Sequence, residues 1–473
     1  MSPQNQSELR QFKNVYFLGI GGIGMSALAR WFHKNSFIVL GYDKTPGSIT
    51  AGLEKEGIAI HFEDSLSAIP SFIKDEKEKT LVVLTPAIPK DHTEWQYFRE
   101  SGYEIMKRSQ VLGLISQGCF TVGVAGTHGK TTTSSMVAYL LKEAGLPCTA
   151  FLGGISANYG TNFIPGDKPL TETIMVVEAD EFDRSFLTLH PDIAVVTSVD
   201  ADHLDIYGNS ETLKKAYADF VAQIKREGSL FIHEKVRLLY ETRTGVRVKT
   251  YGTSEGDIRA EQVQASGFGF EFELKEDLIS HGRFRLNMPG FHNLDNAVAA
   301  LAVAHKLGVS FETLRQILPG FKGVKRRFEK VYEDETVVLL DDYAHHPSEI
   351  DATIRSLRVL YPDKKLGLVF QPHLFSRTRD FALEFSHALN QADKLWLLDI
   401  YPARELPVSG VSSRMILDRV DLSEKEIVSA DKLINSVLAS DCQVVAMLGA
   451  GDIDRLVAPM KEAFVSRLKS FAS

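Results

Sequence analysis

Cysteine is scarce in this chain of 473 residues, which holds only Cys119, Cys148 and Cys442, far apart in the sequence. This spacing suits neither a disulfide framework nor a cysteine-rich zinc site. No apolar run approaches the roughly 18 residues that a membrane span needs. The polar start of the sequence also lacks the apolar segment of a signal peptide. We therefore expect a cytoplasmic protein without structural disulfides.

An excess of positive charge is lacking too, since 53 Lys and Arg stand against 61 Asp and Glu, a net charge of −8. Nucleic acids and anionic membranes bind net basic faces, so we expect neither as a partner. Small anionic ligands stay compatible, because a few local donors can hold them. The length predicts about three domains, at roughly 150 residues per domain.

Short apolar runs alternate with amphipathic stretches of helical length, the pattern of parallel sheets covered by helices. The predicted strands are 14–18, 37–41, 81–84, 120–125, 174–178, 193–198, 337–340, 366–370, 394–399 and 443–448. Between residues 246 and 288, apolar and polar residues alternate, which predicts a small antiparallel side sheet. We predict an α/β fold of three domains: a Rossmann-like domain (1–117), a central P-loop ATPase domain with the parallel and side sheets (118–322), and a Rossmann-like C-terminal domain (323–473).

A first glycine-rich loop follows the strand at 14–18, with Gly19, Gly21 and Gly24 as G-x-G-x-x-G. Such glycines allow a tight turn and let a diphosphate approach the backbone N–H groups at a helix N-terminus. Asp43 ends the next predicted strand, where an acid usually meets a ribose hydroxyl. The motif predicts a bound nucleotide diphosphate, and an NAD-dependent oxidoreductase is one open alternative.

A second glycine-rich loop follows the strand at 120–125, with Gly126, Gly129, Lys130 and Thr131 as G-x-x-G-K-T. In a P-loop, backbone N–H groups surround phosphate oxygens, the lysine reaches the β and γ phosphates, and the hydroxyl binds Mg²⁺. The usual spacing would place another glycine at Val124, so the match is imperfect. The strand-loop-helix order still predicts ATP binding, and a P-loop switch or transport ATPase is a second alternative.

Acidic residues and one histidine gather after two later strands. They are Glu178, Asp180, Glu181 and Asp183 in one segment and Asp200, Asp202, His203 and Asp205 in another. Ligands of parallel sheets bind at the carboxyl ends of the strands, and Mg²⁺ prefers oxygen ligands. These residues predict a metal-nucleotide site, except Asp183 and Asp205, which we interpret as solvated loop residues or helix N-caps. The pattern leaves open which acid of VEADE binds the metal.

Eight segments together resemble one family, the Mur ligases, which are ATP-dependent amide ligases that build the cell-wall peptide stem. They are GTHGKTTT (from Gly126), VEADEFDRSF (Val177), DADHLDIYG (Asp200), FHNLDNAVAA (Phe291), KRRFE (Lys325), DDYAHHPSEI (Asp341), FQPHLFSRTRD (Phe370) and GAGDI (Gly449). They follow the family order over nearly the whole chain. GIGGIGMSALA and DADHLDIYG resemble the member that adds the first amino acid, L-alanine.

The resemblance implies a role for each matching residue. ATP would be bound by Gly126, Thr127, Gly129, Lys130, Thr131, Thr132, His292, Asn296, Arg327 and Asp342. The UDP-sugar would be bound by Gly19, Gly21, Gly22, Gly24, Asp43 and His61, and the amino acid by Tyr343, His345, His373 and Arg377. Two Mg²⁺ ions would be held by Thr131, Glu178 and His203, and the catalytic residues would be Lys130, His203 and Arg377.

The implied reaction joins L-alanine to the lactyl carboxylate of UDP-N-acetylmuramate through an acyl phosphate, in peptidoglycan precursor synthesis for cell shape and division. The expected partners are these small molecules and ATP alone, with the chain a monomer or homodimer. The sister ligase that reattaches a recycled tripeptide to the same UDP-sugar is a close alternative. Residues 319–325, PGFKGVK, are the expected hinge of a closing third domain.

Overall fold

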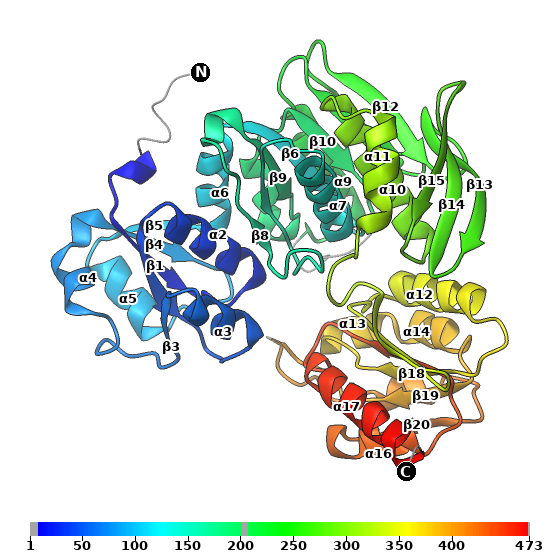
Figure 1. Cartoon of the computed structure of the whole chain (residues 1–473). Helices are drawn as coiled ribbons and strands as arrows, with labels where there is room; N and C mark the ends of the chain where they lie inside the picture. The colour runs from blue at the N-terminus through cyan, green and yellow to red at the C-terminus, as the bar shows by residue number, and fades with distance from the viewer. Residues whose placement is uncertain (1–7, 201–206, 404, 472–473) are drawn as a thin grey trace. The chain divides into compact units, whose positions relative to one another are not determined.

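The computed structural model describes residues 8–200, 207–403 and 405–471 (Figure 1). In these ranges the strands form three sheets of five, ten and six strands. The chain divides into two compact units. Unit 1 comprises Met1–Gln264, Glu271–Asn287 and Asn293–Lys322, and unit 2 comprises Ala265–Phe270, Met288–His292 and Gly323–Ser473. The sheets and their covering helices confirm the predicted α/β class, whereas the three domain boundaries stay predictions.

The first sheet of unit 1 is parallel, with the strand order β3-β2-β1-β4-β5. Its strands are β1 (Asn14–Leu18), β2 (Ile38–Tyr42), β3 (Ala59–His61), β4 (Thr80–Leu84) and β5 (Glu104–Lys107). Its helices are α2 (Ile23–Lys34), α3 (Ser48–Lys55), α4 (Ser71–Asp75), α5 (Thr93–Glu100) and α6 (Arg108–Ser116). The strand order reverses at β1, so the loop after β1 lies at the point where parallel sheets bind ligands.

The alternation of side chains along β1 decides which helices cover each face. Val15 and Phe17 belong to the core that also holds residues of α2 and α6. Tyr16 and Leu18 point the other way, into a smaller core with residues of α4 and α5. Successive residues of a strand face opposite sides, so an almost entirely apolar strand must be covered twice.

The second sheet of unit 1 has the order β15-β14-β13-β12-β11-β10-β6-β9-β7-β8. Its strands are β6 (Phe120–Ala125), β7 (Cys148–Phe151), β8 (Phe163–Ile164), β9 (Ile174–Glu178), β10 (Ile193–Val196), β11 (Ser229–His233), β12 (Arg247–Gly252), β13 (Ile258–Ser266), β14 (Gly269–Glu276) and β15 (Ile279–Leu286). The helices are α7 (Lys130–Glu143), α9 (Ser210–Ala222), α10 (Phe291–Lys306) and α11 (Phe311–Ile317), with 3₁₀ turns at Leu170–Glu172, Phe182–Thr188 and Leu318–Gly320.

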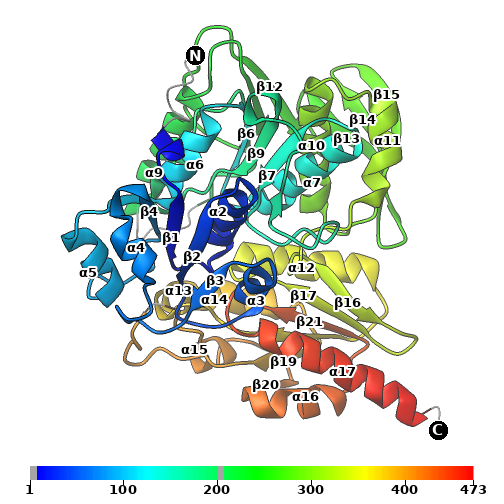
Figure 2. The same ribbon diagram turned by 60° about the vertical axis from the view of Figure 1, so that its left-hand side comes forward.

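The strands expected as a side sheet are continuous with this central sheet. β12 pairs in parallel with β11, from Ser229↔Arg247 to His233↔Tyr251. β13, β14 and β15 then extend the sheet to its edge beside α10 and α11 (Figure 1). At the other edge, α2 of the first sheet lies against β7 and β8 (Figure 2). The two sheets of unit 1 therefore meet through α2.

Unit 2 contains the third sheet, of order β16-β17-β21-β18-β19-β20. The strands are β16 (Glu329–Glu333), β17 (Val338–Asp342), β18 (Leu366–Phe370), β19 (Lys394–Leu397), β20 (Lys425–Ile427) and β21 (Val444–Leu448), and only β16 is antiparallel among the pairs described. The helices are α12 (Pro347–Leu360), α13 (Phe375–Asp380), α14 (Ala382–Leu389), α15 (Arg414–Leu417), α16 (Ala430–Leu438) and α17 (Asp454–Phe471). α12 and α14 cover one face, and α16 and α17 cover the other.

All ten strands predicted from apolar runs are present, with ends shifted by at most a few residues. The strands β1, β6, β9 and β18 begin and end at the predicted residues. Among the described residues, no helix is both long enough and apolar enough to cross a membrane.

Candidate functional site

The first glycine-rich loop packs closely against Tyr42 and Asp43, at the end of β2. Gly19 has a φ of +88°, which favours glycine, and its N–H donates to the carbonyl of Tyr42 at 2.8 Å. A Cβ on Gly21 would lie 2.8 Å from Asp43 Oδ2. Gly22 then caps α2 at its N-terminus. The loop therefore needs glycine for space as well as for conformation.

The carboxylate of Asp43 is engaged by backbone groups of this region. Its Oδ2 accepts a hydrogen bond from the Gly21 N–H at 2.7 Å, and its Oδ1 accepts one from the Thr45 N–H at 3.2 Å. The acid that the sequence assigns to a ribose thus also holds the glycine loop in place. The structure brings Asp43 and the loop together as expected.

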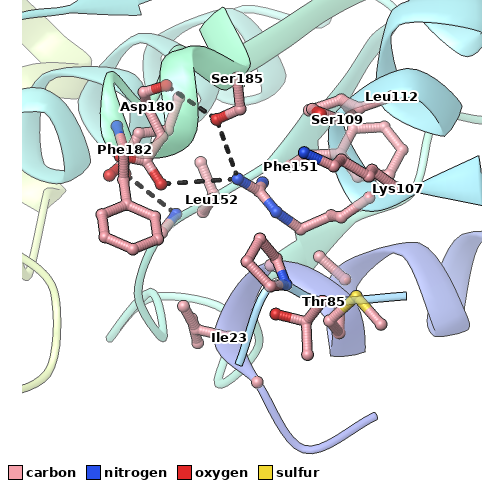
Figure 3. A pocket seen from close by; sticks show the side chains of 18 residues that line it. Ile23, Thr85, Lys107, Ser109, Leu112, Phe151, Leu152, Asp180, Phe182 and Ser185 are labelled. Atoms are coloured by element: carbon pink, nitrogen blue, oxygen red, sulfur yellow. Dashed lines mark hydrogen bonds and ion pairs between the residues drawn. The ribbon is translucent and has the colours of Figure 1, made fainter. Parts of the chain in front are cut away.

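A cavity of about 260 Å³ opens beside this loop and lies entirely within unit 1. Ile23 and Thr85 lie on one side of it, and Asp180 and Ser185 lie on the other (Figure 3). Its lining residues are Gly22, Ile23, Gly24, Met25, Ala27, Thr85, Pro86, Lys107, Arg108, Ser109, Leu112, Phe151, Leu152, Gly153, Glu178, Asp180, Phe182 and Ser185. The cavity joins the glycine loop of the first sheet to Glu178 at the end of β9.

This cavity is also lined by two basic residues, Lys107 and Arg108, which the sequence motifs did not predict as site residues. Lys107 and Arg108 lie at the N-terminus of α6, next to Gly24, where a Cβ would come within 2.9 Å of the Arg108 side chain. Arg108 Nη2 lies 3.5 Å from Asp180 Oδ2 and 3.4 Å from Ser185 Oγ (Figure 3). The N-termini of two helices, which favour an anion, therefore face the same space together with Lys107 and with Arg108, whose charge Asp180 partly balances.

His61 lies away from the residues that line the cavity, at the end of β3. Its Nε2 is 2.7 Å from the Tyr16 hydroxyl and 3.4 Å from Glu94 Oε1, and its Nδ1 is 3.0 Å from the carbonyl of Glu63. Burial lowers the pKa of His61, which favours the neutral ring. The structure does not bring this predicted UDP-facing residue to the cavity.

The second glycine-rich loop connects β6 to α7 and approaches neighbouring backbone closely. Gly126 has a φ of +138°, and a Cβ there would collide with the Thr197 side chain. Gly129, with a φ of +82°, caps α7 in the left-handed conformation. The N–H groups of Thr127 and His128 donate to Ser198, at its carbonyl and its hydroxyl. The hydroxyl of Thr127 lies 3.0 Å from the carbonyl of Asp200.

Lys130 lies at the first position of α7, and its ammonium group is held inside the loop. It donates to the carbonyls of Gly126 at 2.7 Å and Thr127 at 3.3 Å, and it lies 2.8 Å from Glu181 Oε2. Burial alone would lower the pKa of Lys130, but nearby carboxylates, that of Glu181 foremost, raise it above its usual value. The lysine is therefore charged and pre-positioned at the helix N-terminus.

The residues after Lys130 are buried, and one of them contacts Asn296. Thr131 and Thr132 are largely covered, and Thr133 Oγ1 donates to Asn296 Oδ1 at 3.0 Å. Asn296 Nδ2 lies 3.3 Å from Asn293 Oδ1. The structure thus places Asn296 beside the P-loop helix, where a Cβ on Gly129 would meet it at 2.6 Å.

Oxygen atoms suited to Mg²⁺ are present at the ends of β9 and the P-loop. Glu178 lines the cavity, and its Oε2 accepts the Gly153 N–H at 3.0 Å. Thr131 is buried at the start of α7. Among the described residues no three His, Cys, Asp or Glu side chains form a metal cluster, and His203 lies outside them. The two predicted ligands that the structure describes, Thr131 and Glu178, offer oxygen atoms, which are the ligands that Mg²⁺ prefers.

Unit 2 brings together most of the residues assigned to the amino acid. The ring of His345 lies 5.2 Å from that of Tyr343 and 5.8 Å from that of His373. The guanidinium of Arg327 lies over the Tyr343 ring at 4.9 Å. Arg377 lies on the short helix α13. The side chains of Arg327, Tyr343, His345 and His373 thus form one cluster, and Arg377 lies on the helix that follows β18.

Two further predicted residues of unit 2, Asp342 and His292, differ in exposure. Asp342 ends β17, is buried, and accepts a hydrogen bond from Thr353 Oγ1 at 2.7 Å. Burial raises its pKa, and Arg327 opposes that change. His292 is exposed at the start of α10.

Tyr401 and Glu405 of unit 2 belong to the same neighbourhood and were missed by the sequence reading. The Tyr401 ring stacks on His373 at 5.8 Å, and its carbonyl accepts the Leu374 N–H at 2.9 Å. Glu405 Oε2 accepts the Ser376 N–H at 3.0 Å, at the N-terminus of the helix that carries Arg377. Neither residue lies in a motif, so only their position after β19 could have suggested them.

Family models match most of the chain. The model described as "Mur ligase family, catalytic domain" matches residues 14–118, "Mur ligase middle domain" matches 124–304, and "Mur ligase, glutamate ligase domain" matches 326–451. The three matches follow the order of the three sheets.

Full-length relatives are similar to the chain throughout. A protein of Cytophaga hutchinsonii named UDP-N-acetylmuramate–L-alanine ligase is 46% identical over 455 residues, covering 96% of this chain and 97% of the relative. One of Porphyromonas gingivalis with the same name is 47% identical over 460 residues, covering 95% and 98%.

Solved structures show the same architecture. The UDP-N-acetylmuramate-alanine ligase of Thermotoga maritima superposes with a TM-score of 0.82 at 28% identity, over 96% of this chain and 99% of that one. A murein peptide ligase of Psychrobacter arcticus reaches a TM-score of 0.69 at 21% identity, over 95% and 98%, and shares the fold.

Proposed function

The chain belongs to the Mur ligase family, and from this premise we propose that it joins L-alanine to the lactyl carboxylate of UDP-N-acetylmuramate, while ATP becomes ADP and phosphate. One observation carries the proposal for the site. A single cavity has the glycine loop on one side and Glu178 on the other, and Arg108 reaches from Gly24 to Asp180. A sugar nucleotide that ends in a carboxylate matches both sides, because its diphosphate needs N–H groups and cations while its carboxylate needs a metal site.

The UDP-sugar end of the proposed site rests on charge. The N-termini of α2 and α6 meet at the cavity together with Lys107 and Arg108. The net charge of the chain is −8, so these local groups supply the positive potential that a diphosphate requires.

The chemistry then needs no protein nucleophile. A lactyl carboxylate oxygen attacks the γ-phosphorus, the bond to the β-γ bridging oxygen breaks, and ADP leaves. The amine of L-alanine attacks the acyl carbonyl, loses a proton, and expels phosphate from the tetrahedral intermediate. Both steps require aligned reactants and neutralised charge, which Lys130 at the start of α7 is placed to provide.

Mg²⁺ bound by Thr131 and Glu178 would neutralise phosphate charge and orient the carboxylate. The chain's own part is to hold these oxygens: Gly153 fixes Glu178 by a backbone hydrogen bond, and burial fixes Thr131. The assignment of His203 as a ligand and catalytic residue, and the number of ions, stay proposals that rest on the family motif.

Unit 2 supplies the proposed amino-acid residues. Arg377 would pair with the carboxylate of L-alanine, since guanidinium and carboxylate form bidentate ion pairs. Tyr343, His345 and His373 would surround the small side chain. His292, Arg327 and Asp342 would contact the nucleotide. We likewise propose the division of these tasks among residues 1–117, 118–322 and 323–473, and a cytoplasmic location, where ATP is the co-substrate.

The alternatives explain less. An NAD-dependent oxidoreductase would account for the first glycine-rich loop and for Asp43 alone. It would leave Lys130 and Glu181 without a role. The tripeptide-adding alternative is supported by solved neighbours at 21% and 26% identity, whereas the alanine ligases are 46% and 47% identical to the chain.

The test is phosphate release with ATP, Mg²⁺ and UDP-N-acetylmuramate, measured against a panel of amino acids and the recycled tripeptide. We expect release to depend on L-alanine, with weaker rates for glycine and L-serine, because one methyl or hydroxyl changes transition-state binding by about 1–3 kcal/mol. Stimulation by the tripeptide and not by L-alanine would overturn the proposal.

A further inference from the structure

Asn162 is a fully buried amide in the loop before β8, and its side chain reaches across to α2 of the first sheet. Its Nδ2 donates to the carbonyl of Ile23 at 2.5 Å and to Ser26 Oγ at 3.0 Å. Its Oδ1 accepts a hydrogen bond from Arg30 Nη1 at 2.5 Å. The Asn162 side chain thus makes hydrogen bonds to three residues of α2, which span two turns of the helix.

The backbone of Asn162 connects these hydrogen bonds to the residues on the other side of the cavity. Its carbonyl accepts the N–H of Leu152 at 2.9 Å. Gly153, which follows Leu152 in the chain, donates its N–H to Glu178 Oε2 at 3.0 Å. Ile23, Leu152, Gly153 and Glu178 all line the cavity. Asn162 is therefore the middle of a hydrogen-bonded chain from the first turn of α2 to the carboxylate of Glu178.

We propose that Asn162 is a positioning residue, which sets the distance between the diphosphate-binding glycine loop and the carboxylate-binding end of β9. The inference rests on the proposed function, because it needs one substrate that spans both sides of the cavity. Misplacement of a reacting group by about 1 Å can cost roughly 100-fold in rate. A residue that joins two sheets is thus able to control catalysis without touching the substrate.

The chemistry of the amide explains why asparagine suits this position. A carboxamide carries both donors and an acceptor on one short side chain. The donors satisfy α2, and the oxygen satisfies Arg30, which is itself held by Glu56 at 2.8 Å. An aspartate would keep the bond to Arg30 but would turn an acceptor toward the Ile23 carbonyl.

The test compares two ligands in titration calorimetry with Mg²⁺, for the wild type, Asn162→Ala and Asn162→Asp. UDP ends at the diphosphate and engages only the glycine-loop side. We expect its affinity to stay near the wild-type value in both variants. The affinity for UDP-N-acetylmuramate should fall about tenfold, as loss of one or two buried hydrogen bonds implies. In turnover, kcat should fall by a further tenfold or so while KM for ATP changes little.

Asn14→Ala is the matched control, since Asn14 is equally buried and its Nδ2 also makes two bonds, to Thr80 Oγ1 at 3.3 Å and Glu76 Oε2 at 3.2 Å. It lies at the opposite end of β1 from the glycine loop. This variant should lose thermal stability as Asn162→Ala does, but keep wild-type affinity for both ligands.

Equal losses for UDP and UDP-N-acetylmuramate, or no loss for either, would overturn the positioning role. Asn162→Asp is nearly isosteric, so it decides the question if the alanine variant does not fold. A wild-type protein that binds UDP-N-acetylmuramate but does not turn it over with L-alanine would refute the proposed function and leave the ligand comparison intact. A wild-type protein that binds neither ligand would refute both.

Discussion

The two glycine-rich loops of unit 1 obtain their positive charge in different ways. The second loop carries Lys130 in its own motif, at the start of α7. The first has no basic side chain between Gly19 and Gly24, and Arg108 reaches it from α6. One anion site is thus complete in a local segment, whereas the other exists only after β4 and β5 have placed α6 beside α2.

Two buried acids of unit 1, Glu181 beside the second loop and Glu94 on α5, differ in whether a cation balances their charge. Glu181 lies 2.8 Å from the Lys130 ammonium, so its charge is balanced by a cation. Glu94 is fully buried on α5, and its carboxylate lies 2.7 Å from the Tyr16 hydroxyl and 3.4 Å from His61 Nε2. Burial raises the pKa of Glu94 to about 7. A buried acid without a permanent cation partner tends to be neutral, and the first domain contains such an acid.

The largest effect is expected at the second loop. Lys130→Ala should lower kcat by about 100-fold or more, because loss of a group that stabilises transferring phosphate charge costs that much. Phosphate release under saturating substrates measures it. Lys142→Ala, at the other end of α7, is the control and should turn over normally. Near-normal turnover of Lys130→Ala would contradict the role of that lysine.

At the first loop, Arg108→Ala should act on the other substrate. Loss of a charged hydrogen-bond donor costs about 1.5–3 kcal/mol, which corresponds to a rise in KM for UDP-N-acetylmuramate of roughly 10-fold to 100-fold. KM for ATP should change little, and initial rates at varied substrate concentrations give both. The control is Arg99→Ala on the exposed side of α5. An equal rise for ATP would remove the distinction between the loops.

Asp43→Ala tests the conformation of the first glycine-rich loop, and it should raise KM for UDP-N-acetylmuramate less than Arg108→Ala does. The variant loses two acceptors of backbone N–H groups, each worth about 0.5–0.7 kcal/mol, so KM for UDP-N-acetylmuramate should rise roughly fivefold to tenfold. Kinetics with the UDP-sugar measure this change. Micromolar binding of NADH by the wild type, lost in the variant, would instead favour the oxidoreductase reading.

The smallest effect is expected for the free energy of unfolding, through the buried carboxyl group of Glu94 on α5. The unfolded chain ionises Glu94 near pH 4.5 and the folded chain near 7, so the free energy of unfolding falls as pH rises between these values and is unaffected below them. The upper bound is about 3 kcal/mol. Glu94→Gln should remove this loss, and its thermal midpoint relative to wild type should be higher at pH 8 than at pH 5.

Glu100→Gln provides the comparison for that measurement, since Glu100 is an exposed acid at the end of the same helix. Its midpoint should follow the wild type at every pH. Curves for Glu94→Gln that stay parallel to wild type would show that Glu94 titrates normally in the folded chain.

Much of the fold and the second loop could be predicted because their signals are local. The strand from Phe120 to Ala125, the glycines and Lys130 follow one another in sequence, and the helix begins where expected. His61 stays a prediction as a UDP-facing residue, and it is not among the residues that line the cavity, because its ring turns toward Tyr16 and Glu94. Tyr401 and Glu405 were missed because they lie in a loop without a motif.

Taken by itself, the sequence determined the alternation of strands and helices, the two glycine-rich turns and the family, since each depends on residues close together or on their order along the chain. Only the tertiary structure decided that Arg108 faces Gly24 and that Asn162 joins α2 to Glu178. Arg30 and Asn162 are separated by 132 positions. Hydrogen bonds between such distant residues depend on how the two sheets pack, which no local pattern of side chains encodes.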